Sequence, residues 1–131
     1  MNDDAGVEQP SGDSVRFTVS TESDGIGTVV VSGDVDLLTA PHMAAAVQRA
    51  QESGKAVLLD LSGVDFLGSA GLSVLVQAAR RAGDDHGRFA VLVTSHPVQR
   101  AIEVTGLDAA LSIFKTADAA ADYLKGAQAD G

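Results

Sequence analysis

A serine between small residues at a predicted strand-to-helix junction is the side chain with the clearest chemical potential in this sequence. Ser69 lies in the run Phe66-Leu-Gly-Ser-Ala-Gly-Leu72, after a buried apolar stretch and before apolar residues at helical spacing. A hydroxyl at a helix N-terminus lies beside unpaired backbone N–H groups and the positive end of the helix dipole, which favour a phosphate. The spacing leaves two roles open: a hydroxyl that caps the helix, or one that is phosphorylated.

Hydrolytic chemistry at Ser69 is the enzymatic alternative. The nucleophile elbow needs glycine two residues before and two residues after the serine, and Leu67 occupies the first of these positions. His42, His86 and His96 have no spacing that marks a general base, and they are too scattered for a metal site. The glycines match neither a Walker A loop nor a dinucleotide fingerprint. We therefore expect no catalytic residue, no metal and no cofactor.

Two carboxylates follow the second predicted strand. Asp34 and Asp36 belong to the run Gly33-Asp-Val-Asp36, near the start of a predicted helix. Propensity alone favours ordinary solvated turn residues. They gain a role only if their turn lies beside Ser69, because a phosphate there would meet standing negative charge.

Hydrophobic periodicity predicts the elements that position these residues. Strands are expected at 15–21, 28–32, 56–61, 88–93 and 111–114, and helices at 39–52, 69–83, 97–104 and 117–125. Asp24 and Gly25 supply a hairpin turn, Thr39 and Thr116 are the expected helix caps, and Gly106 ends the third helix. The order β-β-α-β-α-β-α-β-α predicts an α/β fold with a mixed, mostly parallel five-stranded sheet.

Size and charge narrow the classes of function. The chain has 131 residues, 45% hydrophobic content, no cysteine and a formal net charge of -9, without a basic stripe that could bind nucleic acid or an anionic membrane. No apolar run is long enough for a bilayer, and the N-terminus is acidic. We expect a cytoplasmic protein with one domain at 15–125 and flexible tails at 1–14 and 126–131.

Three motifs in the right order resemble the STAS domain. They are Gly33-Asp-Val-Asp36 after the second strand, Asp60-Leu-Ser-Gly-Val64 in the central strand, and Phe66-Leu-Gly-Ser-Ala-Gly-Leu72 at the helix start. The resemblance covers about residues 15–125 and implies the STAS fold with about four helices. Because the chain is short and lacks a transporter-like membrane part, it looks most similar to the bacterial anti-sigma factor antagonists.

That resemblance implies a regulatory binding protein and not an enzyme. In the family, the unphosphorylated domain binds an anti-sigma factor that is also a serine kinase, and this frees the sigma factor. Phosphorylation of one serine blocks binding, and a phosphatase restores it. Matched to the motifs, the phosphorylated serine is Ser69 and the family's acidic residue is Asp36. The implied partner-binding residues are Asp36, Gly68, Ser69, Ala70, Gly71 and Ser73.

One position departs from the family pattern. Many members have aspartate immediately before the phosphorylated serine, where this chain has Gly68. The change removes a carboxylate that would repel the phosphate. Two other functions stay open: a STAS module that binds a nucleotide or anion at the same helix N-terminus, and a scaffold subunit of a signalling assembly. An antagonist is expected to be a monomer or a weak homodimer, whereas a scaffold should self-associate.

Overall fold

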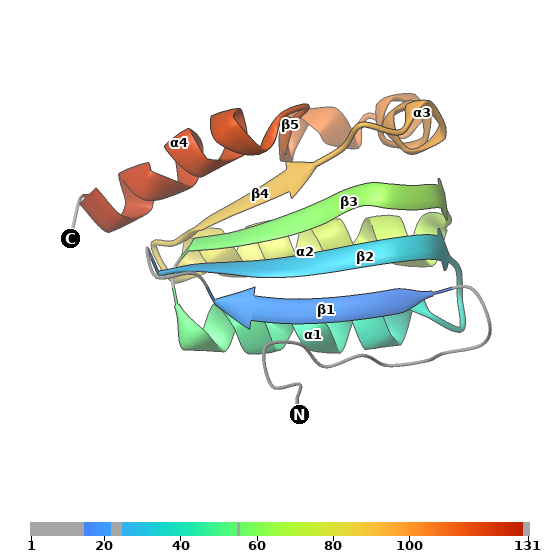
Figure 1. Cartoon of the computed structure of the whole chain (residues 1–131). Coiled ribbons are helices and arrows are strands. Elements are labelled where there is room, and N and C mark those ends of the chain that lie inside the picture. The colour runs from blue at the N-terminus through green and yellow to red at the C-terminus, as the bar shows by residue number, and fades with distance from the viewer. Residues whose placement is uncertain (1–14, 22–24, 55, 130–131) are drawn as a thin grey trace.

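Five strands form one sheet, in the spatial order β1-β2-β3-β4-β5 (Figure 1). The computed structural model describes residues 15–21, 25–54 and 56–129. The predicted tail at 1–14 and Asp24 of the predicted turn lie outside these residues. The strands are β1 (Arg16–Thr21), β2 (Ile26–Val35), β3 (Ala56–Leu67), β4 (Arg88–Leu92) and β5 (Ser112–Phe114).

The connections confirm the predicted order and the mixed sheet. β1 pairs antiparallel with β2, as the hairpin prediction required, and β2 to β5 are parallel neighbours. Parallel neighbours need crossover connections, and helices supply them here. The helices are α1 (Ala40–Ser53), α2 (Ser69–Asp84), α3 (His96–Val104) and α4 (Ala117–Ala129), with a short 3-10 helix η1 (Leu107–Ala109) before β5.

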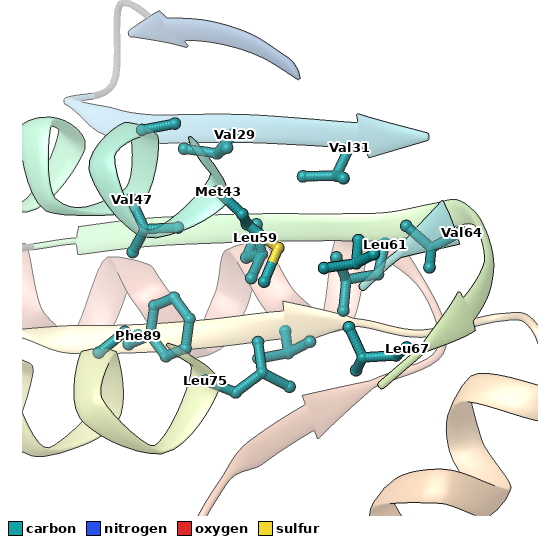
Figure 2. Close-up of a cluster of buried hydrophobic side chains, with 14 of the residues drawn as sticks. Val29, Val31, Met43, Val47, Leu59, Leu61, Val64, Leu67, Leu75 and Phe89 are labelled. Atoms are coloured by element: carbon teal, nitrogen blue, oxygen red, sulfur yellow. The ribbon is translucent and has the colours of Figure 1, made fainter. Parts of the chain in front are cut away.

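Alternation along the central strands divides the core between the two faces of the sheet. On β3, Val57, Leu59 and Leu61 join the larger hydrophobic cluster, whereas Ala56 and Leu58 face the smaller one. The larger cluster contains apolar residues of α1, α2 and α3, and Figure 2 shows side chains of α1 and α2 packed against β2, β3 and β4. The smaller cluster packs under α4. Successive side chains of β3 therefore point to opposite faces of the sheet, and helices cover the apolar residues on both faces.

The central strand is longer than the sequence indicated. The apolar run predicted a strand at 56–61 followed by a loop, but β3 continues to Leu67 beside a β2 that reaches Val35. Two register shifts accommodate the polar residues of this extension. Gly33 has φ +97°, and a Cβ on Gly63 would lie 2.9 Å from the Cβ of Ser32, so glycine permits both irregularities.

Helix ends agree with the predictions at most positions. Gly106, with φ +75°, follows α3, and the Thr116 hydroxyl accepts a hydrogen bond from the Ala119 N–H at 3.2 Å, as an N-cap does. At the other end, α4 continues past the predicted last residue, Lys125, to Ala129. Residues 126–129, for which the composition predicts a flexible tail, are therefore helical in the structure.

Candidate functional site

The extended β2–β3 pairing brings the two sequence motifs together. Val35 and Leu67 are register partners at the carboxyl ends of the two strands, and the Gly68 N–H donates to the Val35 carbonyl at 2.9 Å. The turn that begins at Asp36 therefore starts beside the junction that leads into Ser69. The Asp36 turn and the start of α2 therefore occupy the same edge of the sheet, and Asp34 lies near the end of β2, which leads into that turn.

Ser69 is exposed and is the first residue of α2. The N-cap is Gly68, with extended backbone angles of φ -80° and ψ 178°, and no side chain caps the helix. The interpretation of Ser69 as the capping hydroxyl is therefore wrong. Among the described residues no hydrogen bond to the Ser69 hydroxyl is found, so it is open to modification. A phosphate on it would lie at the positive end of the α2 dipole, which favours negative charge.

The neighbours of Ser69 divide into packing residues and surface residues. Gly71 is buried, and a Cβ there would lie 2.5 Å from Leu67 Cδ1 and 3.0 Å from Val35 Cγ1. Gly68 and Ala70 are half-buried, whereas Ser73 is exposed. Ser73 follows Ser69 by one helical turn and lies on the same face of α2. Small residues at the start of α2 thus let the helix approach the ends of β2 and β3 closely.

Gly68, the residue before Ser69, lies against an aromatic ring. A Cβ at this residue would lie 3.3 Å from Cε2 of Phe66, and its backbone angles are open to any residue type. The Phe66 ring is half exposed, so it has room to move. A larger side chain at residue 68 would therefore require a small shift of the Phe66 ring.

Asp36 organises the turn between β2 and α1. Its Oδ1 accepts hydrogen bonds from the backbone N–H of Leu38, the backbone N–H of Thr39 and the Thr39 hydroxyl, each at 3.0 Å. Its own N–H donates to Thr39 Oγ1 at 2.8 Å. The Thr39 N–H, followed by the Thr39 hydroxyl, lowers the pKa of Asp36 because these donors favour the carboxylate. Thr39 is the N-cap residue of α1 as predicted, but its hydroxyl bonds to Asp36 and not to the helix.

A groove beside Ser69 was not predicted from the sequence. It has a volume of about 360 Å³ between α2 and the segment that follows α3. Its lining residues are Ser69, Leu72, Ser73, Val76, Gln77, Arg80, Thr105 and Leu107. Ser69, Ser73, Val76 and Arg80 recur at intervals of four, three and four residues, a helical signal in the sequence. That signal could identify one wall, but it could not identify Thr105 and Leu107 on the other.

A second hollow lies at the opposite edge of the sheet, where β3 and β4 begin. Its volume is about 400 Å³, and it is lined by Gln51, Glu52, Ser53, Gly54, Ala82, Asp85, Gly87 and Arg88. It shares no residue with the Ser69 groove. In the part of the chain that the structure describes, no group of three or more histidines, aspartates or glutamates is placed to hold a metal ion.

The sheet order and the crossover helices define a small α/β module with an exposed serine at the start of α2, and residues 18–120 match the STAS domain family. The chain belongs to the STAS domain family. It is 30% identical over 119 residues to the anti-sigma-F factor antagonist RsfB of Mycobacterium tuberculosis, which covers 90% of this chain and 96% of that protein.

Solved structures agree with this relationship. An anti-sigma factor antagonist from Mycobacterium paratuberculosis superposes with a TM-score of 0.77 at 32% identity, covering 91% of this chain and 99% of the other. The phosphorylated form of the Bacillus protein SpoIIAA superposes with a TM-score of 0.62 at 17% identity, covering 82% and 97% of the two chains, and supports the fold. The chain is thus a homologue of anti-sigma factor antagonists, and these relatives bear out the expectation of a regulatory protein that is not an enzyme.

Among residues 15–21, 25–54 and 56–129, no helix is long and apolar enough to cross a bilayer.

Proposed function

We propose that this chain is an anti-sigma factor antagonist whose unphosphorylated form binds an anti-sigma factor serine kinase and so releases a sigma factor. Phosphorylation of Ser69 blocks that binding, and a phosphatase restores it. The names of two relatives, both antagonists of anti-sigma factors at 30% identity or more, support the class of partner. The exposed Ser69 hydroxyl at the start of α2 is the observation that carries the switch.

The partner surface follows the carboxyl ends of β2 and β3 and the first turn of α2. It comprises Asp36, Gly68, Ser69, Ala70, Gly71 and Ser73. Ser69 and Ser73 offer exposed hydroxyls, whereas the buried Gly71 contributes by allowing α2 to lie close to Leu67. Asp36 contributes the turn that borders the surface.

Local electrostatics provides the mechanism of the switch. A phosphoserine carries a charge of about -1.5 to -2 at neutral pH. Asp34, Asp36 and Asp65 are exposed on the last residues of β2 and β3 or just after them, and residues 56–79 contain no lysine or arginine. A partner that docks on Ser69 would have to desolvate the phosphate, whereas the free domain keeps it at the α2 N-terminus. An effect of about 1–3 kcal/mol already changes affinity roughly 5- to 150-fold.

Net charge narrows the classes of partner that the proposed antagonist can bind. A net charge of -9 disfavours nucleic acid and anionic membranes as direct partners. We place the protein in the cytoplasm, where a kinase and a phosphatase can reach Ser69. It acts there as a monomer or weak homodimer and needs no cofactor.

The test uses the full chain and each purified anti-sigma factor of the source genome. Incubation with a kinase-type anti-sigma factor and ATP is expected to place one phosphate on Ser69, located by mass spectrometry. Calorimetry should then show binding by the unmodified chain and by Ser69→Ala, and at least roughly fivefold weaker binding by the phosphorylated chain and by Ser69→Glu.

Three results would contradict the proposal. The first is an absence of binding between the unmodified chain and every anti-sigma factor. The second is phosphate confined to Ser73, Thr94 or Ser95. The third is equal affinity of wild type and Ser69→Glu for a partner that binds.

A further inference from the structure

Exposed apolar side chains collect beside Ser69. The described residues include five large hydrophobic side chains with substantial exposure, namely Val30, Leu37, Leu38, Phe66 and Val104. Leu37, Leu38 and Phe66 lie within three residues of the Val35–Leu67 register pair. Leu37 is 77% exposed and Leu38 79% exposed, so neither contributes much to the core of the free domain. Contiguous exposed apolar side chains rimmed by polar residues mark interaction sites, and Leu37 and Leu38 are adjacent and flanked by exposed Asp36.

The turn that presents these leucines is tightly organised. Asp36 Oδ1 accepts from the backbone N–H groups of both Leu38 and Thr39, and the Asp36 carbonyl accepts from the Ala40 N–H at 2.8 Å. Thr39 is only 6% exposed and anchors the turn in the domain. The backbone between these fixed points leaves the leucine side chains in solvent. The hydrogen bonds of Asp36 Oδ1 therefore lie within the turn itself, so Asp36 acts as a positioning residue.

The charge around the leucines indicates the chemistry of a complementary surface. Asp34, Asp36 and Asp65 are exposed, and residues 17–48 and 56–79 contain neither lysine nor arginine. Arg16 faces Ser32 across the β1–β2 ladder, before the turn begins. A surface of leucines among carboxylates complements an apolar pocket bordered by cations.

We propose that Leu37 and Leu38 are the apolar anchors of the partner interface, held outward by the Asp36–Thr39 turn. They insert into an apolar pocket that lysine or arginine side chains border on the anti-sigma factor. This inference rests on the proposed function and adds to it, because it assigns the attractive part of the interface to the β2–α1 turn and the switch to α2. Asp36 then acts through the leucines and not by pairing with a cation of its own.

The experiment measures the Kd of the full chain and its variants for the anti-sigma factor that binds wild type. Leu37→Ala and Leu38→Ala are each expected to weaken binding about tenfold or more, as buried anchors do. Val30→Ala is the matched control, because Val30 is an exposed apolar residue in the middle of β2, and its Kd should stay within about twofold of wild type. Thermal unfolding checks that each variant is folded.

A second pair of variants separates positioning from direct charge contact. In Asp36→Asn the side-chain oxygen can still accept from the N–H groups of Leu38 and Thr39, whereas Asp36→Ala removes the acceptor. We expect the Kd of Asp36→Asn to lie within about threefold of wild type and Asp36→Ala to bind as weakly as the leucine variants. Raising the salt concentration should weaken wild-type binding, because rim charges are screened.

The outcomes distinguish the two proposals. If wild type binds no anti-sigma factor, both the proposed function and the anchor role are overturned. If wild type binds and the Leu37→Ala/Leu38→Ala double variant binds equally well, the anchor role alone is overturned. Equal loss in Asp36→Asn and Asp36→Ala would overturn the positioning role of Asp36, and salt-independent affinity would overturn the cationic border of the partner pocket.

Discussion

Replacing Gly71 by alanine tests whether close packing sets the position of α2, and with it the position of Ser69. The added Cβ would lie 2.5 Å from Leu67 Cδ1 and 3.0 Å from Val35 Cγ1. Favourable carbon contacts lie near 3.5–4.0 Å. Leu67 is 4% exposed and Val35 is fully buried, so neither can swing into solvent. The start of α2 must therefore shift away from the ends of β2 and β3.

The expected cost follows from two opposing effects. Overpacking of a filled core costs about 1–3 kcal/mol. Alanine recovers about 0.5–1 kcal/mol over glycine through its helix propensity. A net loss of about 1–2 kcal/mol corresponds to a decrease in Tm of roughly 4–8 °C for a domain of this size.

Gly83→Ala is the matched control in the same helix. Gly83 is exposed, and a Cβ there would meet no atom within 4 Å. Only the propensity gain remains, so this variant should unfold roughly 2–4 °C above wild type. Urea unfolding of both variants, followed by circular dichroism, gives the free energies of unfolding. Equal stability of Gly71→Ala and Gly83→Ala would refute close packing at Gly71 as the constraint on the position of α2.

Three further predictions concern other parts of the molecule. Ser69→Glu should change the Tm by no more than a few degrees, because the side chain is exposed and the added charge lies at a helix N-terminus. The same variant should weaken partner binding. Differential scanning fluorimetry measures the Tm, and calorimetry measures the affinity. The pKa of Asp36 is lowered in the folded state, so its contribution to stability is complete above the unfolded value of about 3.9 and is lost as pH falls through the folded value. The difference in Tm between wild type and Asp36→Asn should accordingly narrow below about pH 4, and an unchanged difference would contradict the Thr39 hydrogen bonds as its source. Arg88→Ala should lose about 1–2 kcal/mol and loosen α4, because Arg88 Nη1 donates to the Tyr123 carbonyl at 2.8 Å and its guanidinium lies 4.8 Å from the Tyr123 ring centroid. Hydrogen exchange in α4 should increase while the affinity for the partner stays unchanged.

The part of the fold that depends on local patterns was predictable. Alternating residues in β1, the apolar run at 56–59 and the helical spacing after Ser69 each predict a strand or helix from residues close together in the sequence. Gly106 and Thr116 mark helix ends through backbone and capping chemistry that operates over a few residues. Crossover rules then lead from the order of elements to a mostly parallel sheet.

The end of β3 was not predictable in the same way. Ser62 and Gly63 resemble the start of a loop, and only pairing with β2 through two register shifts keeps residues 62–67 in the sheet. Those pairings join residues about thirty positions apart, so no local pattern contains them. The same extension places Gly68 against the Val35 carbonyl and gives the N-cap position to Gly68 and not to Ser69.

The sequence by itself determined the α/β class, the acidic surface and the presence of a serine at the start of a helix, because composition and short-range periodicity carry these properties. Only the tertiary structure decided what surrounds that serine. It brings the Asp36 turn to the same edge, leaves Leu37 and Leu38 in solvent and forms a groove between α2 and the segment after α3. Each of these features depends on which distant segments pack together, and that is a property of the whole domain's energy and not of any single stretch of residues.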